Sequence, residues 1–335
     1  MSQSESLKQY SSVYIIIIAL CVVATIYRPG YFDATNIYMM LRQAAALGII
    51  SMGHLFVVTA GGSDLSVDAT MKISMVVIML FYNNFGEQWI LAGIIAALAI
   101  SVILGAINGF IISRFNVTAF LVTIFTGVVF DGLRRMFTGI SPMGSTPPQI
   151  AQLVKGEEVG AIPYAAYILL AVTVVAYIVM NRTVFGRKLM LVGNNPTAAD
   201  LSGIRVRRMV FITYLITGGA AVLAALVVAG YTGYVDQETL GTGMGFASLI
   251  AVILGGNMWG EGKPTVIGTL GGALAATLIL NFVVLFGFQI QHQHVFKGFI
   301  LIMVILVSSY VRNRTFTLGN FDLNYKAPKM KQKKS

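Results

Sequence analysis

Long apolar runs separated by short polar clusters are the feature that most limits what this chain can fold into. Dividing the sequence at those clusters leaves apolar runs near residues 12–27, 43–61, 66–83, 90–113, 117–139, 161–181, 209–230, 245–257, 264–288 and 296–311. Several runs are close to the ~20 residues that a helix needs to cross the hydrocarbon core of a bilayer. Because 56% of the residues are hydrophobic and only 11% are charged, the chain also lacks the charged surface of an ordinary soluble protein. The sequence therefore predicts a membrane protein.

The predicted fold class is an all-α polytopic membrane protein. No water is present inside a bilayer to bond backbone N–H and C=O groups, so spanning segments must be helices or closed barrels, and runs of this length favour helices. We expect about ten transmembrane helices, or about eight if the short runs near 245 and 296 do not span. The first run follows Lys8 and no A-x-A cleavage pattern comes after it, so it is predicted to be an uncleaved span. Residues 1–335 are thus predicted to form a single transmembrane domain.

The positions of the basic residues predict how the chain is oriented. Residues 182–208 and 312–335 together hold more than half of the 23 lysines and arginines, whereas residues 230–245 hold Asp236 and Glu238 and no basic residue. Since cytoplasmic loops of membrane proteins are enriched in Lys and Arg, we expect the first two segments in the cytoplasm and the third outside. Both termini are then cytoplasmic. The net charge of +10 is explained by this bias, and no nucleic-acid partner is predicted.

The predicted cytoplasmic loop, residues 182–208, contains signals for a short helix of its own. Asn195 is a favourable N-cap, Pro196 suits the first helical position, and Gly203 suits the left-handed residue that follows a helix. The residues predicted to be helical after Pro196 are Thr197, Ala198, Ala199, Asp200, Leu201 and Ser202. A helix of about two turns is unstable alone in water and is expected to pack against something. Two interpretations stay open at this point, a stiff loop that only fixes topology and a docking element for a soluble partner.

The same loop carries a recognisable pattern. The spacing T-x-x-G-R-x-x-x-x-V-G-N-N-x-x-A-A-x-L-S-G-I, from Thr183 to Ile204, resembles the cytoplasmic coupling loop of the permease subunits of carbohydrate ABC importers, the ribose, xylose, galactose and autoinducer-type family. Further matches follow the family's order along the chain: GGSDLSV at 61–67, NG at 108–109, TAFLVT at 118–123 and AVILGG at 251–256. The resemblance covers nearly the whole chain.

The resemblance implies a permease subunit of the bacterial inner membrane that works with other proteins. It implies a cytoplasmic ATP-binding subunit that holds residues 195–203 in a groove, an extracytoplasmic solute-binding protein, and a second permease, either the same chain or a homologue. ATP and Mg²⁺ are expected on the ATPase subunit, and no cofactor on this chain. The nearest approach to a P-loop lies at residues 257–264, where Asn257 and Pro264 replace the residues that the phosphate-binding pattern requires. The chain is therefore not expected to be an enzyme.

The match to the family pattern is imperfect at several positions. Ser63 and Asp68 replace the Ile and the last Gly of G-G-I-D-L-S-V-G, and Thr118 stands where Pro is usual. Residues 130–132 read Phe-Asp-Gly where the family has Ala-Arg-Gly, and residues 244–248 lack the acidic E-L-D-type element that normally precedes the AVILGG run. These departures weaken any transfer of sugar identity more than they weaken the architecture.

A second group of residues surrounds Asp64. An acidic group at membrane depth by default suggests a function, so Asp64 is a candidate for contact with the solute. Gly61 and Gly62 also permit a break in the helix, after which Ser63 or Asp64 can cap the next helix. Both interpretations stay open. The predicted substrate path consists of Asp64, Ser66, Asn108, Phe120 and Thr123, although interhelical hydrogen bonds explain the polar members equally well.

No catalytic residue and no metal site are predicted. His54 lies within an apolar run and is expected to be a packed or helix-bridging residue rather than a proton carrier. His292 and His294 have a spacing that can hold a metal ion, but no Cys, Asp or Glu lies near them in the sequence.

The predicted function is import of a simple sugar or a similar polyhydroxylated solute, driven by ATP hydrolysis in a partner subunit. One alternative is the permease of a related amino-acid or nucleoside ABC importer. Another is a secondary transporter that needs no ATPase, for which Asp64 and Asp131 are the only candidate ion-coupling carboxylates within the runs.

Overall fold

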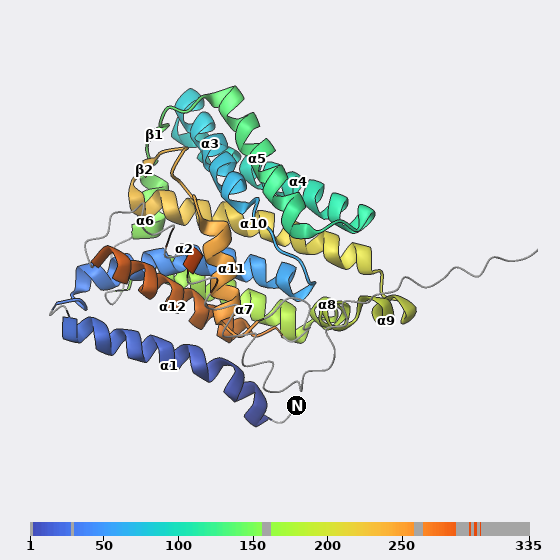
Figure 1. The fold of residues 1–335 in the computed structure, drawn as a ribbon. Helices are drawn as coiled ribbons and strands as arrows, with labels where there is room; N and C mark the ends of the chain where they lie inside the picture. Colours follow the sequence, from blue (N-terminus) through green and yellow to red (C-terminus); the bar gives the residue numbers. More distant parts are fainter. Residues whose placement is uncertain are drawn as a thin grey trace, which may run out of the picture.

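The computed structural model describes residues 3–27, 30–155, 162–257 and 264–285, together with the isolated residues 295, 298, 299 and 302. The described residues confirm the all-α fold class (Figure 1). Their only strands are β1 (Gly144–Ser145) and β2 (Tyr234–Val235), which form one antiparallel pair. The predicted basic tail, 312–335, and the histidine pair near 293 lie outside the described residues.

Each predicted apolar run up to residue 285 falls on one helix. The helices are, in chain order, α1 (Gln3–Tyr27), α2 (Ala34–Thr59), α3 (Val67–Phe85), the 3-10 helix η1 (Glu87–Trp89), α4 (Ile90–Phe115), α5 (Ala119–Thr138), α6 (Pro148–Lys155), α7 (Tyr164–Arg182), α8 (Val184–Asn194), α9 (Pro196–Leu201), α10 (Val206–Thr232), α11 (Met244–Leu254) and α12 (Val266–Leu285). By length and composition, four segments of the described residues can cross a membrane: Ala34–Thr59, Glu87–Phe115, Tyr164–Arg182 and Val206–Thr232. The number of spans in the whole chain stays a prediction.

Helices α2 and α10 form the centre of the bundle. Helix α10 packs against α2, α3 and α4, and α12 packs against α1, α2 and α11. At the crossing of α4 and α10 a side chain on Gly105 would overlap the backbone of Tyr214, and one on Gly218 would overlap the backbone of Ser101. Small residues at such crossings let helices approach closely without a gap. This close approach brings Tyr214 to the helix break described below.

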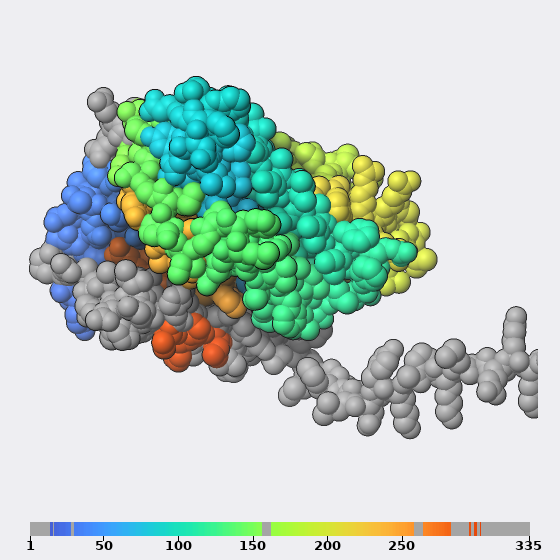
Figure 2. All heavy atoms as spheres, turned by 90° about the horizontal axis from the view of Figure 1, so that it is seen from above, coloured from blue at the N-terminus to red at the C-terminus, as the bar shows by residue number. Residues whose placement is uncertain are grey.

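The molecule has two distinct ends (Figure 1). The α9 end carries α9, the start of α10 and the turn between α4 and α5, whereas the opposite end, here called the sheet end, carries β1, β2 and α6. Seen from above, α3, α4 and α5 cover one face, in the colours from blue-green to green (Figure 2). The sequence predicts the α9 end in the cytoplasm and the sheet end outside.

Two short helices, α6 and α8, were not predicted from the sequence. In α6, Ile150 and Val154 are buried, and Val154 lies where a side chain on Gly230 of α10 would be. In α8, Leu189 and Val192 are buried. Both helices are short and bury only one face, so their apolar residues are too few to form a long run in the sequence.

Candidate functional site

The first candidate region is the coupling element, residues 195–203, which folds as its local sequence predicts. The Asn195 side chain accepts a hydrogen bond from the backbone N–H of Ala198 (3.0 Å), and Pro196 begins the helix. At the other end the Gly203 N–H bonds to the Asp200 carbonyl (2.9 Å), and Gly203 adopts a φ of +79°. Helix α9 ends at Leu201, one residue earlier than predicted, because Ser202 takes the C-cap position.

One face of the coupling element is buried against the protein, and the opposite face is exposed. Ala199 is buried in an apolar cluster with Leu189 and Val192 of α8 and with Ile204. Leu201, by contrast, is 86% exposed. Single exposed apolar side chains are common on protein surfaces, so this geometry fits both the stiff loop and the docking element, and docking stays a prediction.

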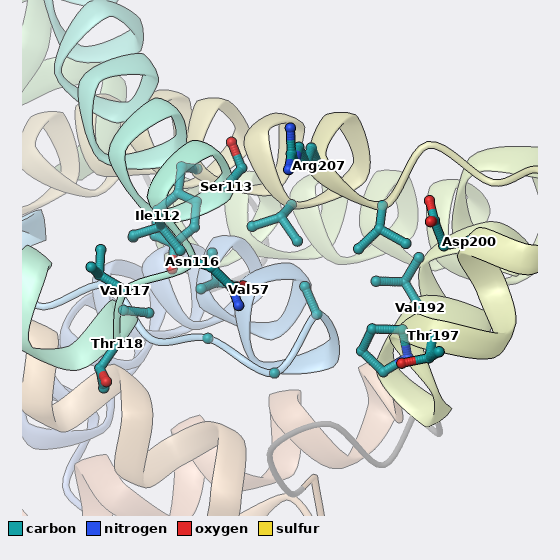
Figure 3. A pocket seen from close by; sticks show the side chains of 18 residues that line it. Val57, Ile112, Ser113, Asn116, Val117, Thr118, Val192, Thr197, Asp200 and Arg207 are labelled. Atoms are coloured by element: carbon teal, nitrogen blue, oxygen red, sulfur yellow. The ribbon is translucent and has the colours of Figure 1, made fainter. Parts of the chain in front are cut away.

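A pocket of about 610 Å³ lies beside the coupling element at the α9 end. In Figure 3, Thr197 and Asp200 of α9 lie on one side of the pocket, and Asn116 and Thr118 of the α4–α5 turn lie on the other. The floor includes Gly61 and Gly62, the residues that follow α2, so the coupling element faces the helix break across this pocket.

The helix break, residues 60–66, separates α2 from α3. The N–H groups of Gly61 and Gly62 bond back to the carbonyls of Val58 and Val57, and Gly61 has a φ of +86° that favours glycine. The Tyr214 hydroxyl of α10 donates to the Ser63 carbonyl (3.2 Å). A side chain on Gly62 would come within 2.6 Å of that hydroxyl. Both glycines are therefore needed for this turn and for its contact with α10.

Asp64 stabilises the break, but it does not cap the next helix. The side chain is buried, and Oδ1 accepts hydrogen bonds from the backbone N–H (3.1 Å) and the hydroxyl (2.6 Å) of Ser66. Ser66 takes the N-cap position of α3, and its own side chain makes no capping bond. The prediction that Ser63 or Asp64 is the cap residue is wrong, because α3 begins at Val67 and Ser66 takes the N-cap position; Asp64 instead accepts from the N–H of that residue.

His54 connects the break to two helices. Its Nε2 accepts from the Asp64 N–H (3.1 Å), and its Nδ1 lies 2.9 Å from Oγ of Ser248 in α11. Since Nε2 accepts, the proton of a neutral imidazole must be on Nδ1, which donates to Ser248. The Ser248 hydroxyl in turn donates to the Gly245 carbonyl (2.9 Å). Of the two structural roles expected for His54, the structure shows the helix-bridging one.

Four of the five residues predicted for the substrate path lie together around the break. The Asn108 amide donates to Oγ of Ser66 (2.7 Å), and Oγ1 of Thr123 accepts from the Leu65 N–H (3.1 Å). These side chains and Asp64 are buried, so a solute reaches them only if the helices separate. The Phe120 side chain is exposed on α5, and only the carbonyl of this residue touches the described network, as an acceptor from the Thr123 hydroxyl (3.4 Å). Contact with substrate stays a prediction for all of them.

Sequence reasoning missed the role of Asp68. Its Oδ2 accepts from the Gly243 N–H (2.7 Å) and its Oδ1 from the Gly245 N–H (2.6 Å), so it caps the start of α11 from a different helix. Helix α11 has only 11 residues and needs partners for its first N–H groups inside the bundle. The signal was present in the sequence, because Asp68 replaces a family glycine and residues 244–248 lack the family's acidic element.

A cluster of charged side chains, also missed, joins α5 to the segment before α11. Arg134 bonds to Oδ1 of Asp131 (2.9 Å) and Oε1 of Glu238 (2.6 Å), and Arg135 bonds to the other oxygens of both acids (2.9 and 2.7 Å). Lys72 of α3 lies 3.9 Å from Asp131. The departure at residues 130–132 was the only sign of this cluster in the sequence.

Comparisons with known proteins cover most of the chain. The family model described as "Branched-chain amino acid transport system / permease component" matches residues 36–308. The chain is 28% identical to the ribose import permease protein RbsC of Escherichia coli K12 over 306 residues, which cover 90% of this chain and 94% of the relative. It is 30% identical to RbsC of Bacillus subtilis 168, over 86% and 89% of the two chains.

A third relative has a different sugar in its name. The galactose/methyl galactoside import permease protein MglC of Haemophilus influenzae is 26% identical over 92% of this chain and 96% of its own. No solved structure matches the chain.

Proposed function

This chain belongs to the family of branched-chain amino acid transport system permease components, and on that premise we propose that it is the membrane-spanning subunit of an ATP-driven importer for a simple sugar or a similar polyhydroxylated solute. The solute class rests on the relatives, since two are named as ribose import permeases and one as a galactose and methyl galactoside import permease. The protein is then an integral protein of the bacterial inner membrane, with the α9 end in the cytoplasm.

The observation that carries this proposal is the coupling element. It is a capped helix, anchored through buried Ala199, with Leu201 exposed at the tip. In the proposal an ATPase subunit holds this helix in a groove, and ATP and Mg²⁺ bind to that subunit. A binding protein delivers the solute at the sheet end, and a second permease of the same or a homologous sequence completes the path. No bond of the solute is broken.

Helix α9 contacts α10, and contacts from α10 to the break support coupling between the ATPase subunit and the path. The coupling element faces Gly61 and Gly62 across the pocket at the α9 end. Tyr214 of α10 bonds to Ser63, and His54 links the break to α11. The pocket leaves room for the coupling element to move relative to the break. We infer that closure of the ATPase subunits shifts α9 and α10 together and loosens the contacts around Asp64.

Two alternatives differ in their support. Import of an amino acid is favoured by the name of the family model, although the named relatives are sugar permeases. Secondary transport needs a carboxylate that exchanges a proton or a cation during transport. Asp131 is instead held in ion pairs with two arginines, and Asp64 accepts two hydrogen bonds from Ser66. Both candidate carboxylates have structural partners.

The decisive experiment reconstitutes the chain, together with a candidate ATPase subunit and a candidate binding protein from the same organism, in proteoliposomes. Labelled ribose, galactose and leucine are offered with ATP or with a non-hydrolysable analogue. We expect uptake of a sugar that requires ATP hydrolysis and is lost without the ATPase subunit. Uptake of leucine and of neither sugar would indicate that the solute is an amino acid. Uptake by the chain alone, driven by an ion gradient, would overturn the proposal.

A further inference from the structure

A second large pocket, here called the sheet-end pocket, opens beside β2 and is formed by α2, α10, α11 and α12. Its volume is about 700 Å³, and pockets of roughly 300–1,000 Å³ accept small organic ligands. The polar part of its lining consists of the amide groups of Asn36, Gln43 and Asn281 and the hydroxyl groups of four threonines and two tyrosines. Apolar side chains such as Met39 and Leu47 complete it. The lining is thus rich in groups that bond to hydroxyls.

Three polar side chains of this lining make no hydrogen bond within the part of the chain that the structure describes. They are Gln43 of α2, Tyr231 of α10 and Asn281 of α12, and all three are partly buried. The amide of Asn36, by contrast, donates to the Tyr31 carbonyl (2.7 Å). Amide and phenol groups that are partly removed from water need a partner, since leaving them unpaired is unfavourable. A polar solute in the pocket would supply that partner to three helices at once.

The charge of the lining limits which solutes fit. Among the described residues, Asp236 is the only acid that lines the pocket, and no Lys, Arg or His lines it. The two Asp236 carboxylate oxygens accept from the Glu238 N–H (2.9 Å) and the Thr239 hydroxyl (2.9 Å). Lys155 of α6 lies beside Gly233, outside the lining. A solute carboxylate would therefore lose its hydration in the pocket without gaining a cationic partner there.

One face of α2 connects the sheet-end pocket to the pocket at the α9 end. Leu47 lines the first pocket, Val57 lines the second, and His54 lies between them on the same face, since helix positions seven and three apart share a face. On α11, Ala247 lines the sheet-end pocket and is followed by Ser248, which bonds to His54. His54 and Ser248 are buried, so in this conformation their contact lies between the two pockets.

We propose that the sheet-end pocket is the outer binding site for the transported solute, and that this solute is an uncharged polyhydroxylated molecule whose hydroxyl groups bond to Gln43, Tyr231 and Asn281. The inference rests on the proposed function and narrows it, because it favours a sugar or polyol over the amino acid in the name of the family model. The solute enters at the sheet end. It reaches the pocket at the α9 end when the contact between His54 and Ser248 opens.

The test measures whether solutes protect a cysteine in the sheet-end pocket of the full-length chain in nanodiscs. Cys21, the only cysteine, is replaced by serine, and Met39→Cys places a thiol at a lining position that is 41% exposed. The measured quantity is its rate of reaction with a charged methanethiosulfonate. Ribose, galactose and sorbitol are the uncharged probes, and sodium gluconate, leucine and glucosamine hydrochloride are the charged probes, all at matched ionic strength. We expect at least one uncharged probe to slow the reaction and the charged probes to have little effect.

Matched variants test the position and the residues. Leu153→Cys, at an exposed sheet-end position outside the lining, should react equally fast with and without every probe. In the Met39→Cys background, Gln43→Leu and Asn281→Leu should each raise the sugar concentration for half-maximal protection about tenfold, because one hydrogen bond is lost. Asn84→Leu should not change it, because the Asn84 amide bonds to the Leu80 carbonyl within α3. An unchanged reaction rate without sugar shows that the variants keep the pocket folded.

Several results would overturn the inference. Protection by none of the uncharged probes would mean that the pocket holds only water. Equal protection by gluconate or leucine would show that the pocket does not select against a carboxylate, and stronger protection by glucosamine would indicate a cation site at Asp236. Unchanged protection in both Gln43→Leu and Asn281→Leu would place the solute elsewhere.

The uptake experiment separates this inference from the proposed function. ATP-driven sugar uptake without protection of the cysteine leaves the importer intact and removes the sheet-end site. Protection by a sugar without ATP-driven uptake leaves the site and removes the importer.

Discussion

The coupling element and the helix break are both short interruptions between long helices, yet they are stabilised in opposite ways. The coupling element, residues 195–203, makes its caps within itself, from Asn195 to Ala198 and from Gly203 to Asp200. The helix break, residues 60–66, is held by side chains from α2, α4, α5 and α10. A self-contained element can move as a unit, whereas a shared element transmits any movement of its neighbours.

This comparison predicts which substitutions should affect binding to a partner and which should affect the stability of the fold. Changes on the free face of the coupling element should leave the fold intact and disturb only a partner. Changes in the break should disturb the packing of several helices at once. The predictions for His54 and Asp68 test buried contacts between helices, and the prediction for Leu201 tests the exposed face of the coupling element.

The largest effect is expected for His54→Ala. The substitution leaves the Asp64 N–H without its acceptor and Ser248 without its donor, and it opens a cavity in a buried site. We expect a loss of about 3 kcal/mol of unfolding free energy, measured by thermal unfolding in detergent and by the yield of monodisperse protein.

Thr59→Val is the matched control for His54→Ala. Thr59 is buried on the same helix, but its hydroxyl bonds only to the Leu55 carbonyl within the helix. Its replacement should cost less than about 1 kcal/mol. Equal losses in the two variants would show that the break is not stabilised by contacts between helices, and the comparison would fail.

A smaller effect is expected for Asp68→Gly, which removes the cap of α11. The first N–H groups of α11 lose their acceptors, and we expect a loss of about 1–2 kcal/mol in thermal unfolding. Placing an acid in the first turn of α11 itself, as Gly245→Glu, should recover part of this loss in the double variant. The substituted side chain would enter the space that the Asp68 carboxylate vacates, since a Cβ at Gly245 lies 3.4 Å from Asp68 Oδ1.

The double variant also tests why the chain departs from its family at two positions. If Gly245→Glu restores stability only when Asp68 is absent, an acidic side chain at position 68 or at position 245 can stabilise the start of α11. If it is neutral or harmful in both backgrounds, the Asp68 contact does not replace the missing acidic element, and the two departures are unrelated.

These residues also show what a single sequence can and cannot predict. The long helices follow from apolar runs, and α9 follows from Asn195, Pro196 and Gly203, because each signal lies within a few residues of its effect. The Asp68 cap joins residues 175 positions apart, so no local pattern reveals it. Arg134 likewise meets Glu238 only after folding. Long-range polar contacts between helices are therefore the part that sequence reasoning missed.

The same limit applies to the residues around Asp64. Four of the five predicted path residues lie together, and their contact with substrate stays a prediction. Interhelical hydrogen bonding was one of the two interpretations of the polar members, and the structure shows such bonds, although the sequence did not give the pairs. Asn108 still has a buried Oδ1 with no hydrogen-bond partner in the described residues, so the network can accept one more donor when the helices move.

The smallest effect on stability, and the largest on assembly, is expected for Leu201→Asp. Since Leu201 is 86% exposed, the substitution should change the unfolding free energy by less than about 0.5 kcal/mol. It should nevertheless prevent the ATPase subunit from co-purifying with the chain and abolish ATP-driven uptake. Ala199 is unsuitable for this test, because it is buried and a large side chain there would displace α9 from α8.

Leu153→Asp provides the matched control for Leu201→Asp. Leu153 is also an exposed leucine on a short helix, α6, but it lies at the sheet end, away from the coupling element. It should retain the ATPase subunit and the uptake rate of the wild type. Loss of the ATPase subunit in both variants would indicate a general effect of the new charge. Retention in both would remove Leu201 and the free face of the coupling element from the interface with the ATPase subunit.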